Sequence, residues 1–416
     1  MTMSRNKPSM AFWTDAGRAV LLVLILLQLS WTTAANAAGW STAPSMMTLR
    51  AYHTSTLLPN GKVLVVGGIN GSGVLDSPEV FDPATGLWSS AGSMSILRQG
   101  HTATLLPNGK VLVMGGKDGA GLYLSSFQLY DPATNAWSAA ISSTIAARWN
   151  HTATLLPSGK VLVVGGYAVR AGVISYLTST ALYDPVANTW SSVGLVGSLN
   201  TGRETHTATV LPNGKVLVAG GKGSSGSLAS AEAFDPATNV WSLIAGSLTQ
   251  ARYSHTATLL PNGKVLFVSG AASASVTRNS AELYDPASGW SSAGTLTARH
   301  SHSATLLPSG KVLIVGGSDP AAMNSAQLYD PDGWSSAGTL AAARYAHTAT
   351  LLSSGQVLAA GGYGAATYLA SVDMYDAGFP GWGSAGSLST GRQNHTATLL
   401  PNTMYCLPGV PMAPVY

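Results

Sequence analysis

Eight short motifs of the form Arg-x-x-His could do chemistry, because each one brings a guanidinium and an imidazole close together. They run along the whole chain, from Arg50 with His53 to Arg392 with His395. A ring of imidazoles could bind a metal ion. Metal sites, however, gather three or four ligands around one ion, whereas each of these histidines belongs to a separate repeat. The spacing therefore favours hydrogen bonding and packing between repeats, with metal binding as the alternative.

The two residues between arginine and histidine differ from copy to copy. In the seven complete copies they read Ala-Tyr, Gln-Gly, Trp-Asn, Glu-Thr, Tyr-Ser, His-Ser and Tyr-Ala. Aromatic rings mixed with hydrogen-bonding groups suit sugars or peptide segments. The candidate ligand-binding residues at these positions are Tyr52, Gln99, Trp149, Asn150, Glu204, Tyr253, His300 and Tyr345. The alternative is that these rings only cover the mouth of the ring of repeats.

No other pattern in the sequence indicates catalysis. The chain carries no carboxylate pair fixed by spacing, no nucleophile elbow and no glycine loop that would cradle a phosphate. Gly-x-Gly strings near Gly71 and Gly119 are typical of turns. We therefore expect no catalytic residue, no metal site and no cofactor, and a binding protein rather than an enzyme.

The elements that position these residues are tandem repeats. The segment HTATLLPNGKVLVVGG recurs with little change from His53 onward, and successive histidines lie 45 to 55 residues apart. Each unit also carries a later block with Asp-Pro and then Trp, as in residues 280–294. Seven units are complete, and the tryptophan of the seventh is Trp382. Self-similarity at this period predicts a repeat architecture.

Four strands per unit follow from local chemistry. Asn-Gly between two runs of β-forming residues predicts a two-residue hairpin between the first and second strands. Asp-Pro supplies a turn between the third and fourth strands. The second strands are almost continuously apolar, which indicates burial on both faces between stacked sheets. We predict an all-β propeller with seven complete four-stranded blades.

The paired glycines after an apolar strand, the later Tyr-Asp and the Trp beyond it resemble the kelch motif. The resemblance covers residues 40–400, with one departure where Ser269 and Gly270 replace the glycine pair. It implies a radial propeller like the central domain of galactose oxidase, here of a bacterial secreted type. Such propellers commonly bind proteins or carbohydrates, and a few members carry out copper-radical oxidation.

The oxidase alternative conflicts with the cysteine content. What the resemblance implies for those oxidases is a Cys cross-linked to a Tyr, with further Tyr and His ligands for copper. The only cysteine is Cys406, beyond the repeats, and it also excludes a disulfide within the chain. The alternatives to a binding scaffold are thus a galactose-oxidase-like relative that lacks this cofactor, or a structural module of a longer surface protein.

The N-terminus is typical of a secretory signal peptide. Basic residues precede an apolar run at 19–27 and an Ala-x-Ala cleavage site at 35–37. We expect a signal peptide over 1–37, a propeller over 38–402 and an aberrant tail over 403–416. The alternative is an uncleaved membrane anchor. Cleavage would leave a secreted or cell-surface protein without a membrane span.

Closure of the ring is open to two interpretations. Residues 39–41 look like an isolated fourth strand, and residues 392–402 look like an isolated first strand. Together they would frame an eighth blade that lacks its middle strands. The repeat pattern breaks after Asn402, which predicts a truncated product or a misread frame of a longer parent.

The charge of the chain does not indicate a nucleic-acid partner. Removing residues 1–37 takes away three of the 21 basic and one of the 17 acidic residues, which leaves a net charge of +2. Most of the remaining charges recur at fixed repeat positions, whereas nucleic-acid binding needs a basic patch. We expect a glycan or protein ligand, no nucleic acid, and a monomer.

One face of the propeller is expected to carry the function. Strand direction alternates within a blade, so the stereotyped turns share one face and the variable loops share the other. The interval between His151 and His206 is the longest, at 55 residues, and most of the excess lies in the loop 167–180. This loop adds Tyr167 and Arg170 to the candidate ligand-binding residues. The alternative is that the loop folds back over its own blade and buries its apolar side chains.

Overall fold

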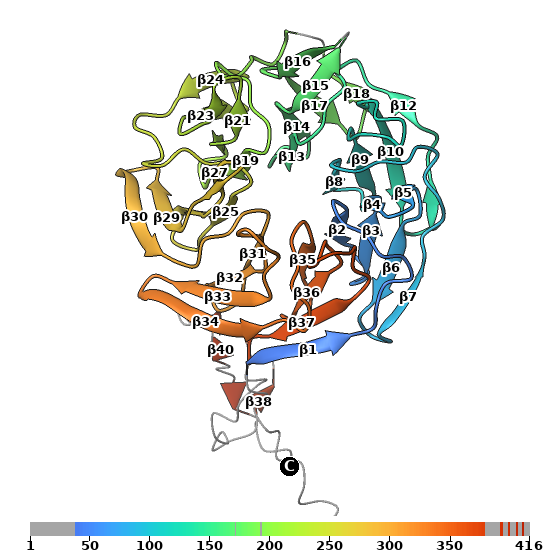
Figure 1. Cartoon of the computed structure of the whole chain (residues 1–416), viewed down its shortest axis with the longest axis vertical. Helices are drawn as coiled ribbons and strands as arrows, with labels where there is room; N and C mark the ends of the chain where they lie inside the picture. Colours follow the sequence, from blue (N-terminus) through green and yellow to red (C-terminus); the bar gives the residue numbers. More distant parts are fainter. Residues whose placement is uncertain are drawn as a thin grey trace, which may run out of the picture.

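The computed structural model describes residues 38–378, apart from residues 171 and 192–193, and the backbone of four short strands beyond residue 378. Seven four-stranded antiparallel sheets stand like blades around a central axis (Figure 1). No helix in the described part of the chain is long and apolar enough to span a membrane. The prediction of an all-β propeller with seven complete four-stranded blades is confirmed.

The four strands of each blade are ordered outward from the axis, with the first strand of the repeat innermost (Figure 1). The first three blades comprise β2 (Thr54–Leu57), β3 (Val63–Val66), β6 (Glu79–Asp82) and β7 (Leu87–Ser90); β8 (Thr102–Leu105), β9 (Val111–Met114), β10 (Ser126–Asp131) and β11 (Ala136–Trp137), with β12 (Ile141–Ser142) also on β10; and β13 (Thr152–Leu155), β14 (Val161–Val164), β17 (Thr180–Asp184) and β18 (Thr189–Trp190).

The remaining blades repeat this order. They comprise β19 (Thr207–Val210), β20 (Val216–Ala219), β23 (Ala231–Asp235) and β24 (Val240–Leu243); β25 (Thr256–Leu259), β26 (Val265–Val268), β29 (Ser280–Asp285) and β30 (Gly289–Thr295); β31 (Ser303–Leu306), β32 (Val312–Val315), β33 (Ser325–Asp330) and β34 (Gly333–Thr339); and β35 (Thr348–Leu351), β36 (Val357–Ala360), β37 (Val372–Asp376) and β1 (Gly39–Ala43).

The second strand of every blade forms the core. All four residues of β3 are buried, and the same holds for its six counterparts. Alternate side chains point to opposite faces, so Leu64 and Val66 pack with Val111 and Val113 of the next blade, while Val63 and Val65 pack with the seventh blade. The apolar runs are therefore explained by burial on both faces of each sheet.

The ring is closed by β1, which pairs with β37 from Gly39 opposite Asp376 to Ala43 opposite Val372. Trp40 lies 5.1 Å from Tyr375 between ring centroids, and its Nε1 donates to the carbonyl of Ala337 at 2.8 Å. The other blades show the same contact between tyrosine or phenylalanine and tryptophan, for example Tyr329 with Trp334 at 5.1 Å.

The eighth blade suggested by the sequence is therefore wrong for the described chain. The segment 39–41 is not an isolated strand, because β1 is the fourth strand of the seventh blade. Pairing β1 with β37 covers the outer edge of β37 and gives the seventh blade the same four strands as the others. Trp382, to which the sequence assigned the fourth position, lies outside the described residues.

The described strands near the C-terminus pair with one another. β38 (Arg392–Gln393) pairs with β41 (Val410–Pro411), and β39 (Thr398–Leu399) pairs with β40 (Tyr405–Cys406). Of the expected first strand over 392–402, the described residues 392–393 and 398–399 pair with residues of the tail, and the others lie outside the described residues. The predicted signal peptide over 1–37 lies outside the described residues.

The stereotyped turns differ in detail from the expected two-residue hairpin. The amide of Leu58 donates to the carbonyl of Lys62 at 2.8 Å, and the amide of Gly61 donates to that of Leu58 at 2.9 Å. Gly61 has a φ of 79°, so the loop is a three-residue turn that ends in a glycine bulge. Lys62 Nζ then reaches Asp82 Oδ2 at 3.1 Å, which shows that the first-to-second and third-to-fourth turns share one face, the turn face.

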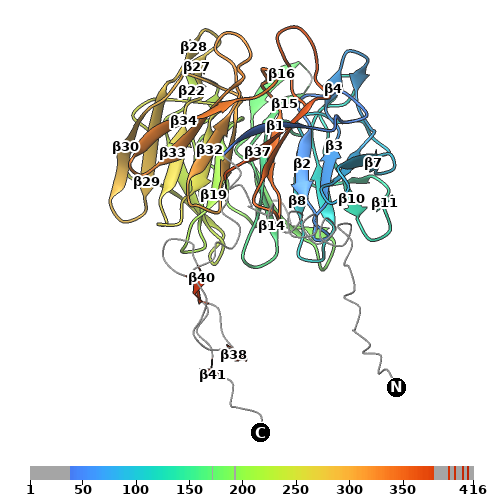
Figure 2. The same ribbon diagram turned by 90° about the horizontal axis from the view of Figure 1, so that it is seen from below.

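The opposite face carries a hairpin extension between the second and third strands of several blades, and we call it the hairpin face (Figure 2). The paired strands there are β4 (Ile69–Asn70) with β5 (Gly73–Val74), β15 (Tyr167–Arg170) with β16 (Val173–Tyr176), β21 (Lys222–Gly223) with β22 (Gly226–Ser227), and β27 (Ala271–Ser273) with β28 (Val276–Thr277).

The closing strand gives a direct test of this topology. Replacing Trp40 by alanine removes its contact with Tyr375 and its hydrogen bond to the sixth blade, and should lower the free energy of unfolding by about 3 kcal/mol. The matched substitution Trp382→Ala should change it little. Urea denaturation followed by circular dichroism measures both. A larger loss for Trp382→Ala than for Trp40→Ala would show that the C-terminal segment, not β1, closes the ring.

Candidate functional site

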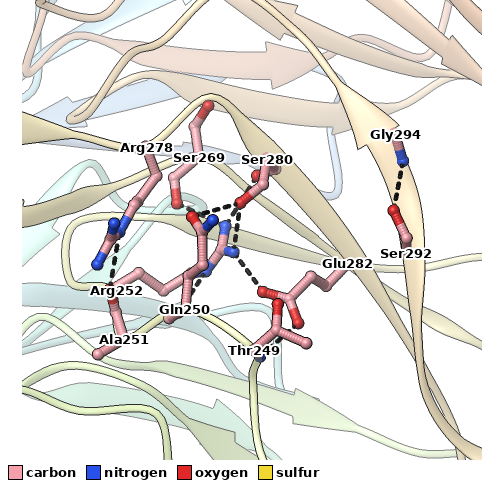
Figure 3. A network of polar contacts seen from close by, with 10 residues as sticks. All are labelled: Thr249, Gln250, Ala251, Arg252, Ser269, Arg278, Ser280, Glu282, Ser292 and Gly294. Atoms are coloured by element: carbon pink, nitrogen blue, oxygen red, sulfur yellow. Dashed lines mark hydrogen bonds and ion pairs between the residues drawn. The ribbon is translucent and has the colours of Figure 1, made fainter.

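The arginine of each motif is an internal brace of its blade. Arg50, Arg98, Arg148, Arg203, Arg252, Arg299 and Arg344 are fully buried. In the fifth blade, Arg252 Nη1 donates to the carbonyls of Ser269 and Ser280, both at 2.9 Å, and Nη2 binds Glu282 (Figure 3). Glu282 Oε2 in turn accepts the amide of Thr249 at 2.7 Å. The arginine therefore ties the loop before it to the ends of the second and third strands.

The acidic partner of this brace varies between blades. Ion pairs also join Arg50 to Glu79 at 2.6 Å, Arg203 to Glu232 at 2.9 Å, and Arg344 to Asp373. In the second and sixth blades a glutamine stands in the acid's place, and burial lowers the pKa of Arg98 and Arg299 to about 10. Both guanidiniums remain cations at neutral pH, so the brace keeps its charge in these two blades without an acidic partner.

The histidine of each motif links its blade to the preceding one. Its Nε2 lies 2.8–3.0 Å from the hydroxyl of the residue that follows the preceding histidine. Seven such bonds form a closed ring, which joins His101 to Thr54, His151 to Thr102, His206 to Thr152, His255 to Thr207, His302 to Thr256, His347 to Ser303 and His53 to Thr348. The packing interpretation of these histidines is confirmed.

The glycine pair makes room for these histidines. A Cβ on Gly67 would lie 2.7 Å from Cε1 of His101 in the next blade, and a Cβ on Gly68 would lie 3.0 Å from Cβ of its own His53. Both glycines also have positive φ, at 59° and 97°. Ser269 keeps the glycine conformation with a φ of 52°, and its buried hydroxyl has no hydrogen-bond partner. The departure from Gly-Gly therefore leaves the turn intact but strained.

A second closed ring fixes the backbone of the variable residues. The residue just before each motif histidine has a φ between 49° and 58°. Its amide donates to the carbonyl of its counterpart in the preceding blade at 3.0–3.3 Å. The seven residues of this ring are Tyr52, Gly100, Asn150, Thr205, Ser254, Ser301 and Ala346. A left-handed conformation is costly for non-glycine residues, and the ring holds each of them in it.

The five predicted aromatic residues do not form one group. Trp149 and Tyr167 lie together with Tyr123 and Tyr176, in contacts of 5.4–6.4 Å between ring centroids. We call these four residues the aromatic cluster. Tyr123 and Tyr176 were not among the predicted site residues, because neither sits between Arg and His and only Tyr167 and Arg170 were chosen from the loop 167–180. Their only sequence signal was their place in the variable loops.

The other predicted tyrosines lie elsewhere on the face. Tyr345 contacts Tyr363 at 5.6 Å, and Tyr363 contacts Tyr368 at 4.9 Å. Tyr52 is 44% exposed, and burial together with the hydroxyls of Tyr345 and Tyr368 raises the pKa of Tyr52. Tyr253 stands apart from both groups, with the ammonium of Lys222 5.9 Å from its ring.

The predicted polar residues divide in the same way. Asn150 Nδ2 donates to Glu204 Oε2 at 3.1 Å, beside the aromatic cluster. His300 Nδ1 lies 3.1 Å from the hydroxyl of Ser301, and Gln99 pairs through its backbone with Lys117. Arg170 belongs to β15 by its backbone, and its side chain lies outside the described residues. The structure therefore brings Trp149, Asn150, Tyr167 and Glu204 together, while Tyr52 and Tyr345 belong to a separate group of tyrosines.

The long loop of the third blade forms a hairpin. β15 and β16 pair from Tyr167 opposite Tyr176 to Arg170 opposite Val173. Val173 and Ile174 are 64% and 59% exposed at its tip, whereas Tyr167 and Tyr176 are half-buried in the aromatic cluster. The alternative that this loop buries its apolar side chains on its own blade is thus wrong for the tip, and at the base the half-buried Tyr167 also contacts Tyr123 of the second blade.

A shallow hollow lies on the turn face, between the second and third blades. It is lined by Pro107, Asn108, Ser158, Gly159, Lys160, Asp184, Pro185 and Val186. Except for Val186, these residues belong to the stereotyped turns, and Lys160 and Asp184 form the recurrent ion pair at 3.1 Å. Because such turns recur in almost every blade, we place the candidate site on the hairpin face instead.

Comparisons with known proteins agree on the architecture. The model of the KLHDC2/KLHL20/DRC7 Kelch-repeats domain matches residues 52–271 and 100–317, which together cover more than half of the chain. No curated protein matches the sequence. A fungal alcohol oxidase of the AA5 family, solved in complex with copper, superposes with a TM-score of 0.66 at 17% identity, over 82% of this chain and 76% of that one. At this identity the likeness concerns the fold alone.

The ring of buried histidines predicts loss of stability in acid. Burial lowers the pKa of all seven imidazoles, to about 3 for His101 and His206. Unfolded imidazoles take up protons below pH ~6.5 while the buried ones stay neutral, so each should lower the free energy of unfolding by about 1.4 kcal/mol per pH unit. Urea titrations at pH 7.5, 6.0 and 5.0 measure the slope. His101→Gln should reduce this slope by the contribution of one histidine, about 1.4 kcal/mol per pH unit. A free energy of unfolding that does not change with pH over this range would contradict the account.

The strained serine predicts a stabilising substitution. Ser269→Gly removes a left-handed serine and its unpaired hydroxyl, and should raise the free energy of unfolding by about 1 kcal/mol after the entropy that glycine gains in the unfolded chain. Gly220→Ser, at the same position of the fourth blade, should lower it, because its Cβ would lie 2.6 Å from Cε1 of His255. Thermal melts measure both variants. If the loss of stability in Gly220→Ser only equals the gain in Ser269→Gly, the positive φ alone accounts for both changes and the close-approach explanation is refuted.

Proposed function

Because this chain belongs to the kelch-repeat family, we propose that it is an exported, non-catalytic binding scaffold whose hairpin face recognises a glycan or a protein. Kelch propellers mediate protein interactions. The apolar run and cleavage site over 1–37 support export to the cell surface or the medium. In this chain, seven similar blades form the ring, and the side chains on the hairpin face differ from blade to blade.

The observation that supports the proposal is that the backbone of the hairpin face is held in the same way in every blade, whereas its side chains differ. The backbone positions of the hairpin face are fixed by seven hydrogen bonds from blade to blade, yet their side chains range from glycine to tyrosine. Packing requires the same residue in each blade, whereas recognition does not. Val173 and Ile174 stand exposed at the tip of the longest hairpin, where an apolar contact with a partner would stabilise both surfaces.

Copper-radical oxidation is the activity that the resemblance to galactose oxidase would imply. The residues present do not fit the copper cofactor that this activity needs. That cofactor needs Cys, Tyr and His side chains around one ion. In the described part of the chain no three His, Cys, Asp or Glu residues gather in a group that could hold a metal ion. The seven motif histidines are each engaged with a hydroxyl of the neighbouring blade. The tyrosine groups include neither histidine nor cysteine.

A loop exchange tests the binding proposal. Leu177 and Leu228 donate equivalent amides to Gly166 and Gly221, at 2.8 Å in both cases, so residues 167–176 can be replaced by residues 222–227 at matched junctions. Ligands found for the mature chain on glycan and protein arrays should be lost, while the melting temperature changes by only a few degrees.

The fifth blade supplies the control for this exchange. Its residues 271–277 end at Arg278, whose amide donates to Gly270 at 2.7 Å, and they can take the same insert. Binding should survive there. Array ligands that survive the exchange in the third blade as well would contradict recognition by its hairpin.

A separate prediction concerns copper. Protein exposed to Cu²⁺ and dialysed should retain no stoichiometric copper and should release no peroxide from primary alcohols or galactose. Metal analysis together with a peroxidase-coupled assay measures both. Stoichiometric copper with turnover would overturn the assignment as a binding scaffold.

A further inference from the structure

We propose that the aromatic cluster, with the carboxylate of Glu204, is a subsite for a neutral saccharide. This inference rests on the proposed binding function and names the chemical class of its ligand. The cluster comprises Tyr123 of the second blade and Trp149, Tyr167 and Tyr176 of the third, beside Glu204 of the fourth. No other part of the described face brings so many rings to one carboxylate.

The cluster combines apolar faces with polar tips, as a sugar does. Glu204 is 8% exposed, and burial raises its pKa. Burial raises the pKa of Tyr123 and of Tyr176, and the charge of Glu204 raises both further, so both phenols lie near this carboxylate. A sugar ring would pack its C–H face on an aromatic ring and direct its hydroxyls to the carboxylate and the amide of Asn150.

The charges around the cluster favour a neutral ligand. The ammonium of Lys117 lies 5.7 Å from the ring centroid of Tyr123 and 5.9 Å from that of Trp149. Lys222 pairs with Glu204 through the backbone, and the hydrogen bond from Asn150 and the charge of Lys222 both lower the pKa of Glu204 against the effect of burial. A cationic ligand would meet two lysines, and an anionic ligand would meet a nearly buried carboxylate. A polyhydroxylated neutral ligand meets neither repulsion.

The orientation of the rings limits the shape of the ligand. Tyr123 and Trp149 are inclined by 51°, Tyr123 and Tyr167 by 66°, and Trp149 and Tyr167 by 69°. A flat crystalline surface could lie on only one of these rings at a time. A single soluble chain, which can turn from one ring to the next, fits the cluster better.

One glycine shows that the sequence makes specific room for this arrangement. Gly100 is the glycine of the backbone ring of variable residues, and the other six blades carry side chains there. A Cβ on Gly100 would lie 1.7 Å from Nε1 of Trp149, so the indole rests directly on this backbone. Ring closure alone does not require glycine at this position, because six other residues adopt the same φ. The placement of Trp149 does require it.

Affinity electrophoresis of the mature chain tests the proposal with defined probes. Gels would contain one soluble neutral polysaccharide each (mixed-linkage β-glucan, xyloglucan, galactomannan or pullulan), with polygalacturonate and DEAE-dextran as the charged counterparts. At least one neutral polymer should retard the protein, and the charged polymers should not after correction for mobility at 0.5 M salt, which screens charge beyond roughly 4–5 Å.

Variants then assign the subsite. Tyr167→Ala and Glu204→Gln should each weaken retardation by roughly tenfold, and Gly100→Ala should do the same by displacing Trp149. Tyr363→Ala, in the tyrosine group of the seventh blade, is the matched control and should bind as the unaltered chain does. Thermal melts of all four variants verify the fold, and Glu204→Gln keeps the shape of the side chain if an alanine variant fails to fold.

The outcomes separate this inference from the function on which it rests. Retardation by a neutral polymer that the cluster variants abolish supports the subsite. Retardation unchanged by those variants, or seen only with charged polymers, overturns it. A protein ligand lost on the hairpin exchange, with no neutral polymer bound, leaves the binding scaffold standing and refutes the saccharide subsite. The absence of any ligand on arrays and gels refutes both.

Discussion

The structure depends on the contact between each motif histidine and the glycine pair of the blade before it. The imidazole fits against a backbone without a Cβ, as at Gly67 with His101, and bonds to a hydroxyl of that neighbouring blade. Six blades repeat this contact, and in the fifth blade Ser269 stands in the place of the first glycine with the same positive φ, so the contact sets the spacing of neighbouring blades around the ring. It also explains why a chain without internal disulfides can hold so large a ring, because every blade is fixed to two others by buried polar and apolar contacts.

The contact constrains what else the propeller can do. Buried imidazoles that each bond to a neighbour are not free to bind a metal ion together, and their neutrality ties stability to pH. The buried arginines form ion pairs with acidic residues of the third strands, as Arg50 does with Glu79. The recurrent residues are thus used in folding, and recognition is left to the few positions that the rings hold without specifying their side chains.

Much of this arrangement could be predicted from the sequence, because repetition within one chain marks packing. The seven blades, the role of the histidines and the shared face of the turns all followed from recurring residues. The closing strand was harder to place, since residues 39–41 and the segment with Trp382 both resemble a fourth strand, and only the pairing of β1 with β37 decides between them.

The candidate site was predicted only in part. Trp149, Asn150, Tyr167 and Glu204 come together as variable residues of adjacent blades, but Tyr52, Tyr253 and Tyr345 do not join them. Spacing along the chain predicts which face a residue occupies, but it does not predict which neighbouring blade its side chain contacts. Tyr123 and Tyr176 were missed for the same reason, because loop geometry brings them to Trp149.

The central claim is that recurrent residues hold the ring while the hairpin face binds. Hydrogen–deuterium exchange of the mature chain, with and without a ligand found on the arrays, tests it most directly. The account predicts slower exchange on ligand binding in the hairpin 167–176 and around Glu204, with no change in the turns at Lys160 and Asp184. Protection confined to those turns would contradict it and would move the site to the turn face.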